Sequence, residues 1–531
     1  MVEEDSRTVL EAVAESACLA AQQRGQKARA LWLPPLPEMV ELAGVVEPMG
    51  SLKAAVGIID RPYYQRQDPF VLDFNVGGGH VALCGGPRSG KSTALRSIVA
   101  SLAATHTTEE VQFYVVDMGG DSQEILSRLP HVVGVAQKKD LGRVHRVFDE
   151  VTALVEAGLP HDGRHTFFII DGWHALATNC EDEVERVTRI VADGAAAGVH
   201  VIISTQRWAI LRPVIRDLID YRLELQLGEA MDSLIDRKAQ QKIPALPGRG
   251  ITPEGESMLW CLCSAQDIAH ITTISADQPP VSELKVLPDF LPYTDLRYAE
   301  GEIVVGIGGI HMASVRWDSD HLLCIGAHGA GKSTALRTVL AGITQRSPRQ
   351  ARVVLVDHRR AHLGAVPEQA LAAYSASSLA TAEALRNTAI TLKERIPGPE
   401  VSAEQLRNRS WWEGPEIYVV IDDADLVDPA ALAEIVPFIP HARDVGLHVV
   451  VAHKSGGINR ALYQPFLAGL RDQIPAVLLL DADKEEGAIC GMKPMAQPPG
   501  RGRWLEQGTE PITIQVASVE KAVERETVGG K

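Results

Sequence analysis

The most restrictive feature of this sequence is a loop pattern that occurs twice, at residues 85–93 (GGPRSGKST) and 326–334 (GAHGAGKST). Both copies have the spacing Gly, four residues, Gly-Lys-Ser, in which glycines let successive backbone N–H groups point at a phosphate. Each copy follows a short apolar run and precedes a helical pattern, so the positive end of a helix would lie under the phosphates. The sequence therefore predicts two nucleotide sites.

Every position of the two loops is predicted to contact bound ATP. These positions are Gly85, Gly86, Pro87, Arg88, Ser89, Gly90, Lys91, Ser92, Thr93, Gly326, Ala327, His328, Gly329, Ala330, Gly331, Lys332, Ser333 and Thr334. Lys91 and Lys332 would supply charge to the outer phosphates, and the hydroxyl groups of Ser92 and Ser333 would bind Mg²⁺.

Further paired segments follow the two loops in the same order, which indicates two copies of one domain. The pairs are residues 111–120 and 351–360, 166–173 and 417–425, 198–207 and 446–455, and 244–250 and 496–502. In each copy, short continuous apolar runs alternate with amphipathic helical stretches such as residues 140–156 and 377–394. This pattern is typical of a mainly parallel sheet with helices on both faces, so we predict an α/β fold with tandem domains.

Four parts of the chain follow from the repeat. Residues 1–30 form an N-terminal segment with a short helix at residues 7–23, residues 31–275 and 276–520 are the two domains, and residues 521–531 are a flexible tail. The boundary is placed where ISADQPP breaks the pattern.

Composition narrows the function classes. The chain has 52 basic and 68 acidic residues, a formal charge of −16, which is the wrong sign for a protein that mainly coats nucleic acid. No apolar run reaches the roughly 18 residues of a transmembrane helix, and the first residues are acidic, so a cytosolic chain without its own membrane span is expected. The seven cysteines have no paired CxxC spacing for zinc or redox chemistry.

The two copies differ where hydrolysis would need side chains. ATP hydrolysis requires a carboxylate for magnesium and a second polar group that orients the attacking water. The second copy has Asp422 and Asp423 at the end of an apolar run, and these are predicted to serve magnesium and water respectively. The first copy has Asp171 followed by Gly172, so it would keep the magnesium carboxylate and lack the second group. The alternative for the acidic pair is a solvated turn after a strand.

Two further residues are candidates for contacts with the phosphates. Arg443, just before a core strand of the second copy, could stabilise the transition state from a neighbouring subunit, although a surface role is an equally plain explanation. Gln206, at the end of the corresponding strand of the first copy, could sense the γ-phosphate.

These motifs resemble the FtsK/SpoIIIE branch of the RecA-like P-loop NTPases. WLPPL, GIIDRPYYQRQ, QFYVVDMGG, LPHVVGVA, IIDGW and LRNRSWW narrow the resemblance to the EccC ATPases of actinobacterial type VII (ESX) secretion. Over residues 29–505 the chain is similar to the split form, in which a soluble EccCb-like chain carries the second and third ATPase domains.

The resemblance implies a motor subunit that is recruited to the inner membrane through a membrane-anchored EccCa-like partner. It implies recognition of WXG100-type substrates through their C-terminal signal, a docking pocket on the last ATPase domain, and a homo-oligomer, as a hexamer, in the assembled machine. ATP turnover would be weak or would need activation.

Two other functions remain open at this stage. A double-stranded DNA translocase of the same fold would bind DNA tightly and in a salt-dependent manner, although the net charge speaks against nucleic acid. A scaffold that binds ATP without turnover would tolerate Asp423→Asn but not Lys332→Ala.

Overall fold

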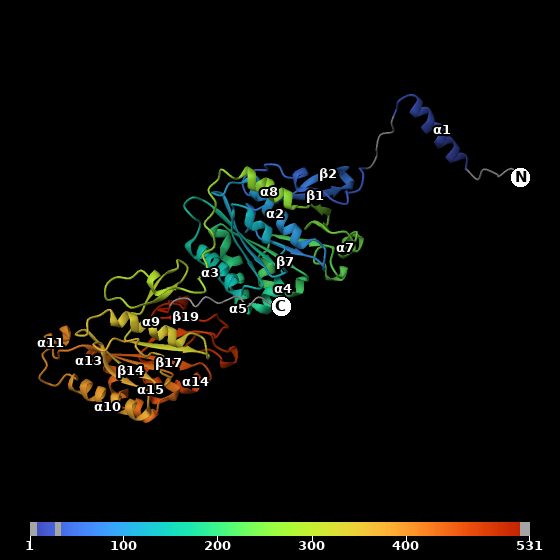
Figure 1. Ribbon diagram of the computed structural model, residues 1–531. Coiled ribbons are helices and arrows are strands. Elements are labelled where there is room, and N and C mark those ends of the chain that lie inside the picture. The colour runs from blue at the N-terminus through green and yellow to red at the C-terminus, as the bar shows by residue number, and fades with distance from the viewer. Residues whose placement is uncertain (1–7, 27–32, 521–531) are drawn as a thin grey trace, which may run out of the picture. The chain divides into compact units, whose positions relative to one another are not determined.

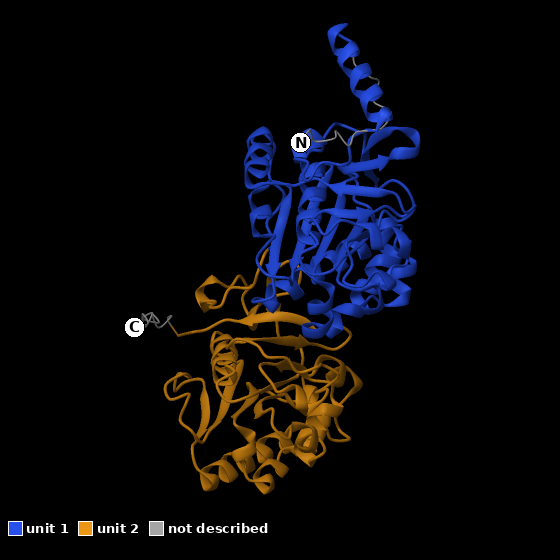
Figure 2. Cartoon of the chain, turned by 90° about the vertical axis from the view of Figure 1, so that its right-hand side faces the viewer, with its two compact units in different colours: residues 1–284 blue, residues 285–531 orange. Residues whose placement is uncertain are grey.

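The computed structural model describes residues 8–26 and 33–520. The predicted N-terminal helix is α1 (Val9–Gln23), which begins with a capping box between Thr8 and Glu11 and buries none of its residues. The predicted tail at 521–531 lies outside the described residues. The chain divides into two compact units, unit 1 (residues 1–284) and unit 2 (residues 285–531), which are coloured separately in Figure 2.

Unit 1 contains one ten-stranded sheet with the order β2-β1-β10-β9-β8-β3-β7-β6-β4-β5. Its strands are β1 (Lys53–Arg61), β2 (Arg66–Asp73), β3 (Val81–Cys84), β4 (Val111–Asp117), β5 (Val132–Gln137), β6 (His165–Asp171), β7 (Val199–Thr205), β8 (Tyr221–Leu225), β9 (Arg249–Ile251) and β10 (Ser257–Trp260). The six strands from β8 to β5 are parallel, and β9, β10, β1 and β2 extend the sheet in antiparallel pairs.

The helices of unit 1 cover both faces of this sheet. They are α2 (Lys91–Thr105), α3 (Leu141–Ala157), α4 (Trp173–Asn179), α5 (Glu181–Asp193), α6 (Pro213–Asp217), α7 (Arg237–Lys242) and α8 (Ala265–Ile274). Leu95 and Ile98 of α2 pack in one core together with α8, and Phe148 of α3 and Trp173 of α4 pack in the core on the opposite face. The strands between them are buried on both sides, which explains their continuous apolar runs.

Unit 2 repeats this topology strand for strand, with the order β12-β11-β20-β19-β18-β13-β17-β16-β14-β15. Its strands are β11 (Val304–Gly308), β12 (Ala313–Arg316), β13 (His321–Gly326), β14 (Ala351–Asp357), β15 (Leu371–Ser375), β16 (Glu416–Asp422), β17 (Leu447–Lys454), β18 (Ala476–Leu479), β19 (Arg501–Leu505) and β20 (Ile512–Val516). Its helices are α9 (Lys332–Thr344), α10 (Ser378–Glu394), α11 (Ala403–Asn408), α12 (Pro429–Ala433), α13 (Ala442–Val445), α14 (Ile458–Ala461) and α15 (Pro465–Asp472). Helix α9 covers one face, and α10 and α15 cover the other (Figure 1).

The predicted α/β fold with tandem domains is confirmed, and each sheet is mixed. The antiparallel part was not predicted because its strands come from distant segments. In unit 1, β1 precedes the loop at residues 85–93 and pairs with β10, which lies near the end of the unit. Within residues 8–26 and 33–520, no helix is long and apolar enough to cross a membrane.

The chain passes from unit 1 to unit 2 after residue 284. Val281 and Leu284 donate backbone hydrogen bonds to Pro130 and Val133 at the edge of β5, so residues up to 284 belong to unit 1 by contact. The contacts thus divide the chain later than residue 275, where the sequence places the limit. Just beyond, the Arg501 guanidinium of unit 2 donates to the backbone oxygens of residues 287 and 288.

Candidate nucleotide-binding sites

Each glycine-rich loop joins the central strand of its sheet to a helix, β3 to α2 in unit 1 and β13 to α9 in unit 2. The last glycine of each loop, Gly90 or Gly331, has a φ of 102° and caps the helix. A Cβ atom at Gly331 would lie 2.8 Å from the backbone nitrogen of Gly500, and one at Gly90 would lie 2.9 Å from that of Gly248. Only glycine combines this positive φ with such close backbone approach.

The repeated PGRG segments are the reason for this close approach. The N–H of Gly248 donates to the carbonyl oxygen of Ser89, and the N–H of Gly500 donates to that of Ala330, both at 2.9 Å. Each PGRG turn therefore packs against its glycine-rich loop and is hydrogen-bonded to it. The sequence showed these segments as a repeat but gave them no role.

The two loop lysines are folded into the concave side of their loops. Lys91 Nζ donates to the carbonyl oxygens of Gly85 and Gly86, each at 2.7 Å. Lys332 Nζ donates to those of Gly326 and Ala327 at 3.1 and 2.9 Å. Burial lowers the pKa of Lys91. Both ammonium groups thus lie against the carbonyl oxygens of their own loops, which bound phosphate would replace as their partners.

In unit 2 the predicted metal residues meet in one hydrogen-bonded group. Ser333 Oγ donates to Asp422 Oδ2 at 2.8 Å, and Nε2 of His362 lies 2.9 Å from the same oxygen. Burial alone would raise the pKa of Asp422, but the hydrogen bonds from His362 and Ser333 outweigh it, so that pKa is lowered. Among the described residues, Asp422 Oδ1 is buried without a hydrogen-bond partner.

The matching carboxylate of unit 1 is held differently. Asp171 Oδ1 accepts from Ser204 Oγ at 2.6 Å, and Oδ2 accepts from the amide of Gln123 at 3.0 Å. The same amide donates to the backbone oxygen of Ser92 at 2.8 Å. In unit 2 the strand register places Ala452 where unit 1 has Ser204, which leaves Asp422 Oδ1 without the equivalent donor.

The residue after each of these carboxylates adopts left-handed backbone geometry. Asp423 has a φ of 52°, and Gly172 has a φ of 90°. Asp423 Oδ2 lies 2.7 Å from Nε of Arg359, an ion pair with a half-exposed arginine. Burial and the neighbouring Asp422 raise the pKa of Asp423. A carboxylate with a raised pKa beside the loop can accept a proton from water more readily than an ordinary aspartate.

Three residues of this group were missed in the sequence. Gln123 and His362 both follow a strand-end aspartate, Asp117 or Asp357, whose oxygens accept backbone N–H groups from the next loop. The segment from the aspartate to this side chain is one residue shorter in unit 2 than in unit 1, so a plain alignment does not pair Gln123 with His362. Arg359 lies in the same loop and carried no motif.

The structure brings only some of the predicted residues together. Gln206 is exposed and directly follows β7, whose last residue, Thr205, accepts a hydrogen bond from Gly85 of the loop. Arg443 lies in α13, before β17, and is exposed. The strands β13 and β17 are parallel. Arg443 precedes β17 and therefore lies at the amino-terminal ends of the strands, whereas the loop that follows β13 lies at their carboxyl-terminal ends.

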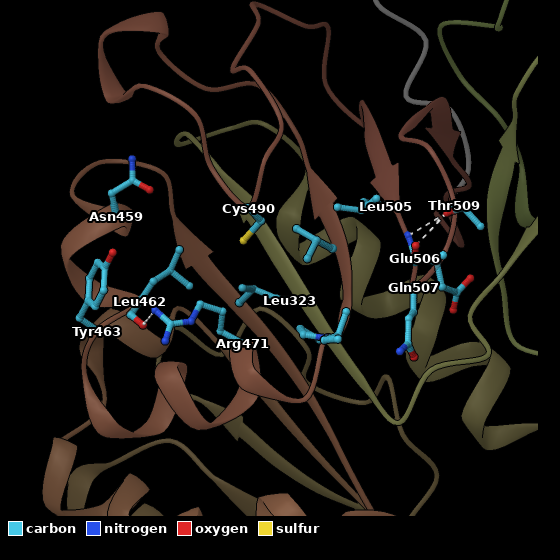
Figure 3. A pocket seen from close by; sticks show the side chains of 14 residues that line it. Leu323, Asn459, Leu462, Tyr463, Arg471, Cys490, Leu505, Glu506, Gln507 and Thr509 are labelled. Carbon is cyan, nitrogen blue, oxygen red and sulfur yellow. Dashed lines mark hydrogen bonds between the residues drawn. The ribbon is translucent and has the colours of Figure 1, made fainter.

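A separate cavity of about 470 Å³ lies in unit 2. Leu323, Leu462, Val477 and Leu505 give it apolar walls. Figure 3 shows Arg471 beside Leu462, to whose carbonyl oxygen it donates. None of the loop residues 326–334 lines this cavity, so it is distinct from the nucleotide site.

Two glycine-rich loops, each with a lysine, a serine and a strand-end aspartate, define a tandem P-loop NTPase. A model of the FtsK/SpoIIIE family matches residues 52–269, within unit 1. The ESX-1 secretion system protein EccCb1 of Mycolicibacterium smegmatis is 32% identical, and the match covers 93% of each chain. The chain belongs to the EccC family of ESX (type VII) secretion proteins.

Other relatives are longer than this chain. It is 34% identical to the ESX secretion system protein EccC of Thermomonospora curvata and 36% identical to EccC4 of Mycobacterium tuberculosis, yet it spans only 42% and 43% of their lengths. A solved structure of T. curvata EccC, ATPases 2 and 3 in complex with a signal sequence peptide, has a TM-score of 0.78 and 33% identity. That likeness covers 92% of this chain and all of the other.

Proposed function

We propose that this chain is an ATP-binding motor subunit of a type VII secretion system, which couples ATP binding and hydrolysis to the export of WXG100-type substrates. The main observation behind this proposal is that each unit places a loop lysine, a loop serine and a buried aspartate at the carboxyl-terminal ends of its parallel strands. The residues fit ATP with Mg²⁺, because Asp422 keeps one buried oxygen without a partner and both loops need glycine where a Cβ would strike backbone.

In unit 2, Lys332, Ser333 and Asp422 would hold the nucleotide and its metal ion, which when bound would neutralise charge on the outer phosphates. Asp423 would orient the attacking water and take its proton, helped by its raised pKa. Because Arg359 holds the carboxylate of Asp423, we infer that turnover requires this ion pair to open. We therefore expect ATP hydrolysis in unit 2 to be weak until an activating event separates Arg359 from Asp423.

In unit 1, Lys91, Ser92 and Asp171 would bind ATP and Mg²⁺, with Gln206 near the γ-phosphate. Both oxygens of Asp171 already accept hydrogen bonds, so its contact with the ion would differ from that of Asp422. Gly172 offers no side chain for the water. Unit 1 therefore retains its nucleotide and turns it over slowly.

Arg443 would act on the site of a neighbouring copy. Arg443 is exposed and lies at the end of the strands opposite to its own nucleotide loop. From this position it could reach the nucleotide site of a neighbouring subunit in a closed ring. We propose that the ring is a hexamer and that a membrane-anchored EccCa-like partner brings this cytoplasmic chain to the inner membrane.

The two units suggest where a signal peptide would bind. In unit 1 the chain's own segment covers the edge of β5, because Val281 and Leu284 donate backbone hydrogen bonds there and Leu284 lies directly over Gly134. Ala373 in β15 is the position of unit 2 that corresponds to Gly134 of unit 1, because Gly134 lies opposite Tyr114 in one sheet and Ala373 lies opposite the matching Val354 in the other.

The edge of β15 is open among the described residues. Ala372 in this strand is exposed, and the nearby Leu363 and Leu379 are 66% and 82% exposed. An unpaired strand edge with apolar side chains beside it suits an added extended peptide. We propose that the C-terminal signal of a secreted WXG100-type substrate occupies this edge, as the chain's own linker does in unit 1.

Binding of a WXG100-type substrate, with and without its last residues, tests this function. The full substrate is expected to bind, and the truncated one is expected to bind at least tenfold more weakly. Leu379→Asp should weaken binding to a similar extent, whereas Tyr463→Ala, on the wall of the cavity in Figure 3, should not. Equal binding of full and truncated substrate would refute signal recognition, and the reverse response of the two variants would place the peptide in the cavity.

A further inference from the structure

We propose that the cation site of unit 2 binds a first-row transition-metal dication through the imidazole of His362 and the carboxylate of Asp422, whereas the site of unit 1 offers oxygen ligands only. This inference rests on the proposed nucleotide site of unit 2. It concerns which metal ion that site prefers and which atom holds it.

The geometry of the group in unit 2 suits a metal ion. One ligand atom each from Asp357, His362 and Asp422 lies within 4.8 Å of the others, and all three residues are buried. Nε2 of His362 is 2.9 Å and Ser333 Oγ is 2.8 Å from Asp422 Oδ2. Two neighbouring ligands of an octahedral ion with bonds of about 2.1 Å lie roughly 3 Å apart, so these separations match one edge of a coordination shell.

Two buried atoms of this group have no hydrogen-bond partner among the described residues. They are Nδ1 of His362 and Oδ1 of Asp422, in side chains that are 0% and 3% exposed. A buried polar atom without a partner is costly, and a metal ion with its water would satisfy Oδ1. For Nε2 to donate its lone pair to the ion, a ring proton could lie only on Nδ1.

The backbone segment that carries His362 is also held in place, by Asp357. Asp357 Oδ2 accepts the backbone N–H of His362 at 2.7 Å, and Oδ1 accepts that of Ala361 at 2.8 Å. These bonds fix the loop backbone from which the imidazole projects before the ion arrives. Asp357 is therefore a positioning residue that also adds negative charge to the site.

Unit 1 has the same frame without a nitrogen ligand. Gln123 directs its amide NH₂ group at Asp171 and at the backbone oxygen of Ser92. An amide NH₂ has no lone pair for a metal ion, whereas imidazole nitrogen favours transition metals over magnesium. The substitution of Gln123 by His362 at the equivalent place thus changes the preferred ion and leaves the fold unchanged.

Manganese is the probe, because its electron spin echo detects a directly bound nitrogen. The full chain with Asp171→Asn, which removes the unit 1 carboxylate, is titrated with MnCl₂, first without nucleotide and then with a non-hydrolysable ATP analogue. We expect a ¹⁴N coupling of bound imidazole. In the same background, His362→Gln should lose this coupling and reduce the preference for Mn²⁺ over Mg²⁺ by roughly tenfold.

A loss of metal affinity alone would not decide the question, because an outer hydrogen-bond partner also affects affinity. Absence of ¹⁴N coupling in the parent chain, or a coupling that survives His362→Gln, would overturn the proposal. The reverse variant, Gln123→His with Asp422→Asn, should create the coupling in unit 1. Binding of the ATP analogue is measured separately, so a failed nucleotide site and a failed metal preference give different results.

Discussion

The two units have the same sheet order and the same loop, yet the side chains around the strand-end aspartate differ at three places. Unit 1 combines Gln123, Ser204 and Gly172, and unit 2 combines His362, Ala452 and Asp423 at the matching positions. In unit 1 both oxygens of the aspartate are occupied by neutral donors. In unit 2 one oxygen is open and a second carboxylate follows. We infer from this comparison that nucleotide binding depends on the shared fold and loop, whereas these few side chains would determine whether hydrolysis can follow.

The largest effect is expected at Asp423. Asp423→Ala should lower ATP turnover, measured with substrate present, by roughly a hundredfold, because a positioned base commonly contributes that much. Lys91→Ala, in the other unit, should leave turnover nearly unchanged. Equal losses from both variants would contradict the assignment of turnover to unit 2.

The next effect concerns nucleotide affinity. Lys332→Ala and Lys91→Ala should each weaken binding of an ATP analogue at their own site by roughly ten- to a hundredfold, because each removes a charged donor to the phosphates. A two-site calorimetric titration measures this. If Lys332→Ala abolishes secretion while Asp423→Asn does not, the chain acts as an ATP-locked scaffold instead of a motor.

A smaller effect is expected from the backbone next to these aspartates. A Cβ atom at Gly172 would lie 3.1 Å from the backbone nitrogen of Gly119, and the φ there is 90°. Gly172→Ala should therefore destabilise unit 1 by about 1–2 kcal/mol. Asp423→Gly, at a φ of 52°, should cost unit 2 much less, because glycine adopts that geometry without strain. Hydrogen exchange of peptides from β6 and β16 would report each unit separately.

These expectations also show what could be predicted from sequence. The glycine-rich loops and the strand-end aspartates are recognised from the residues next to them in the chain. This local pattern is sufficient to predict Lys332 and Asp422 as site residues. Gly172 was recognised as a missing carboxylate. The reason that glycine is favoured there, a left-handed turn against Gly119, depends on a contact between the segments that follow β4 and β6 and could not be predicted.

The partners of the carboxylates were hidden for a related physical reason. His362 reaches Asp422 only because β14 and β16 are adjacent in the sheet, although they are far apart in the chain. Arg359 reaches Asp423 by the same route. Arg443 could be placed near its strand from the sequence, but which end of the sheet it occupies followed from strand direction alone.

The smallest expected effect is on the pH dependence of stability, and it involves the first residues of β16 and β6, the strands that end at Asp422 and Asp171. In unit 2, β16 starts at Glu416, whose oxygens lie 3.4 Å from Nε2 of His448 and 3.5 Å from Nη1 of Arg346. The nearby imidazole of His448 is the main cause that lowers the pKa of Glu416 to about 2. In unit 1, β6 starts at His165, whose ring stacks on His200, and burial lowers the pKa of His200 to about 4.

The signs of these shifts separate the two units. The folded pKa of Glu416 is below its ordinary value of 4.5, so its stabilisation is present above pH 4.5 and is lost as the pH falls toward 2. The folded pKa of His200 is below its ordinary 6.5, so unit 1 loses stability earlier, as the pH falls from 6.5 toward 4. Glu416→Gln should destabilise unit 2 at pH 7, and its deficit relative to the wild type should shrink below pH 4.5. Hydrogen exchange of β16 peptides at pH 7 and pH 3.5 measures this, and a deficit independent of pH would mean that Glu416 acts through packing instead of charge.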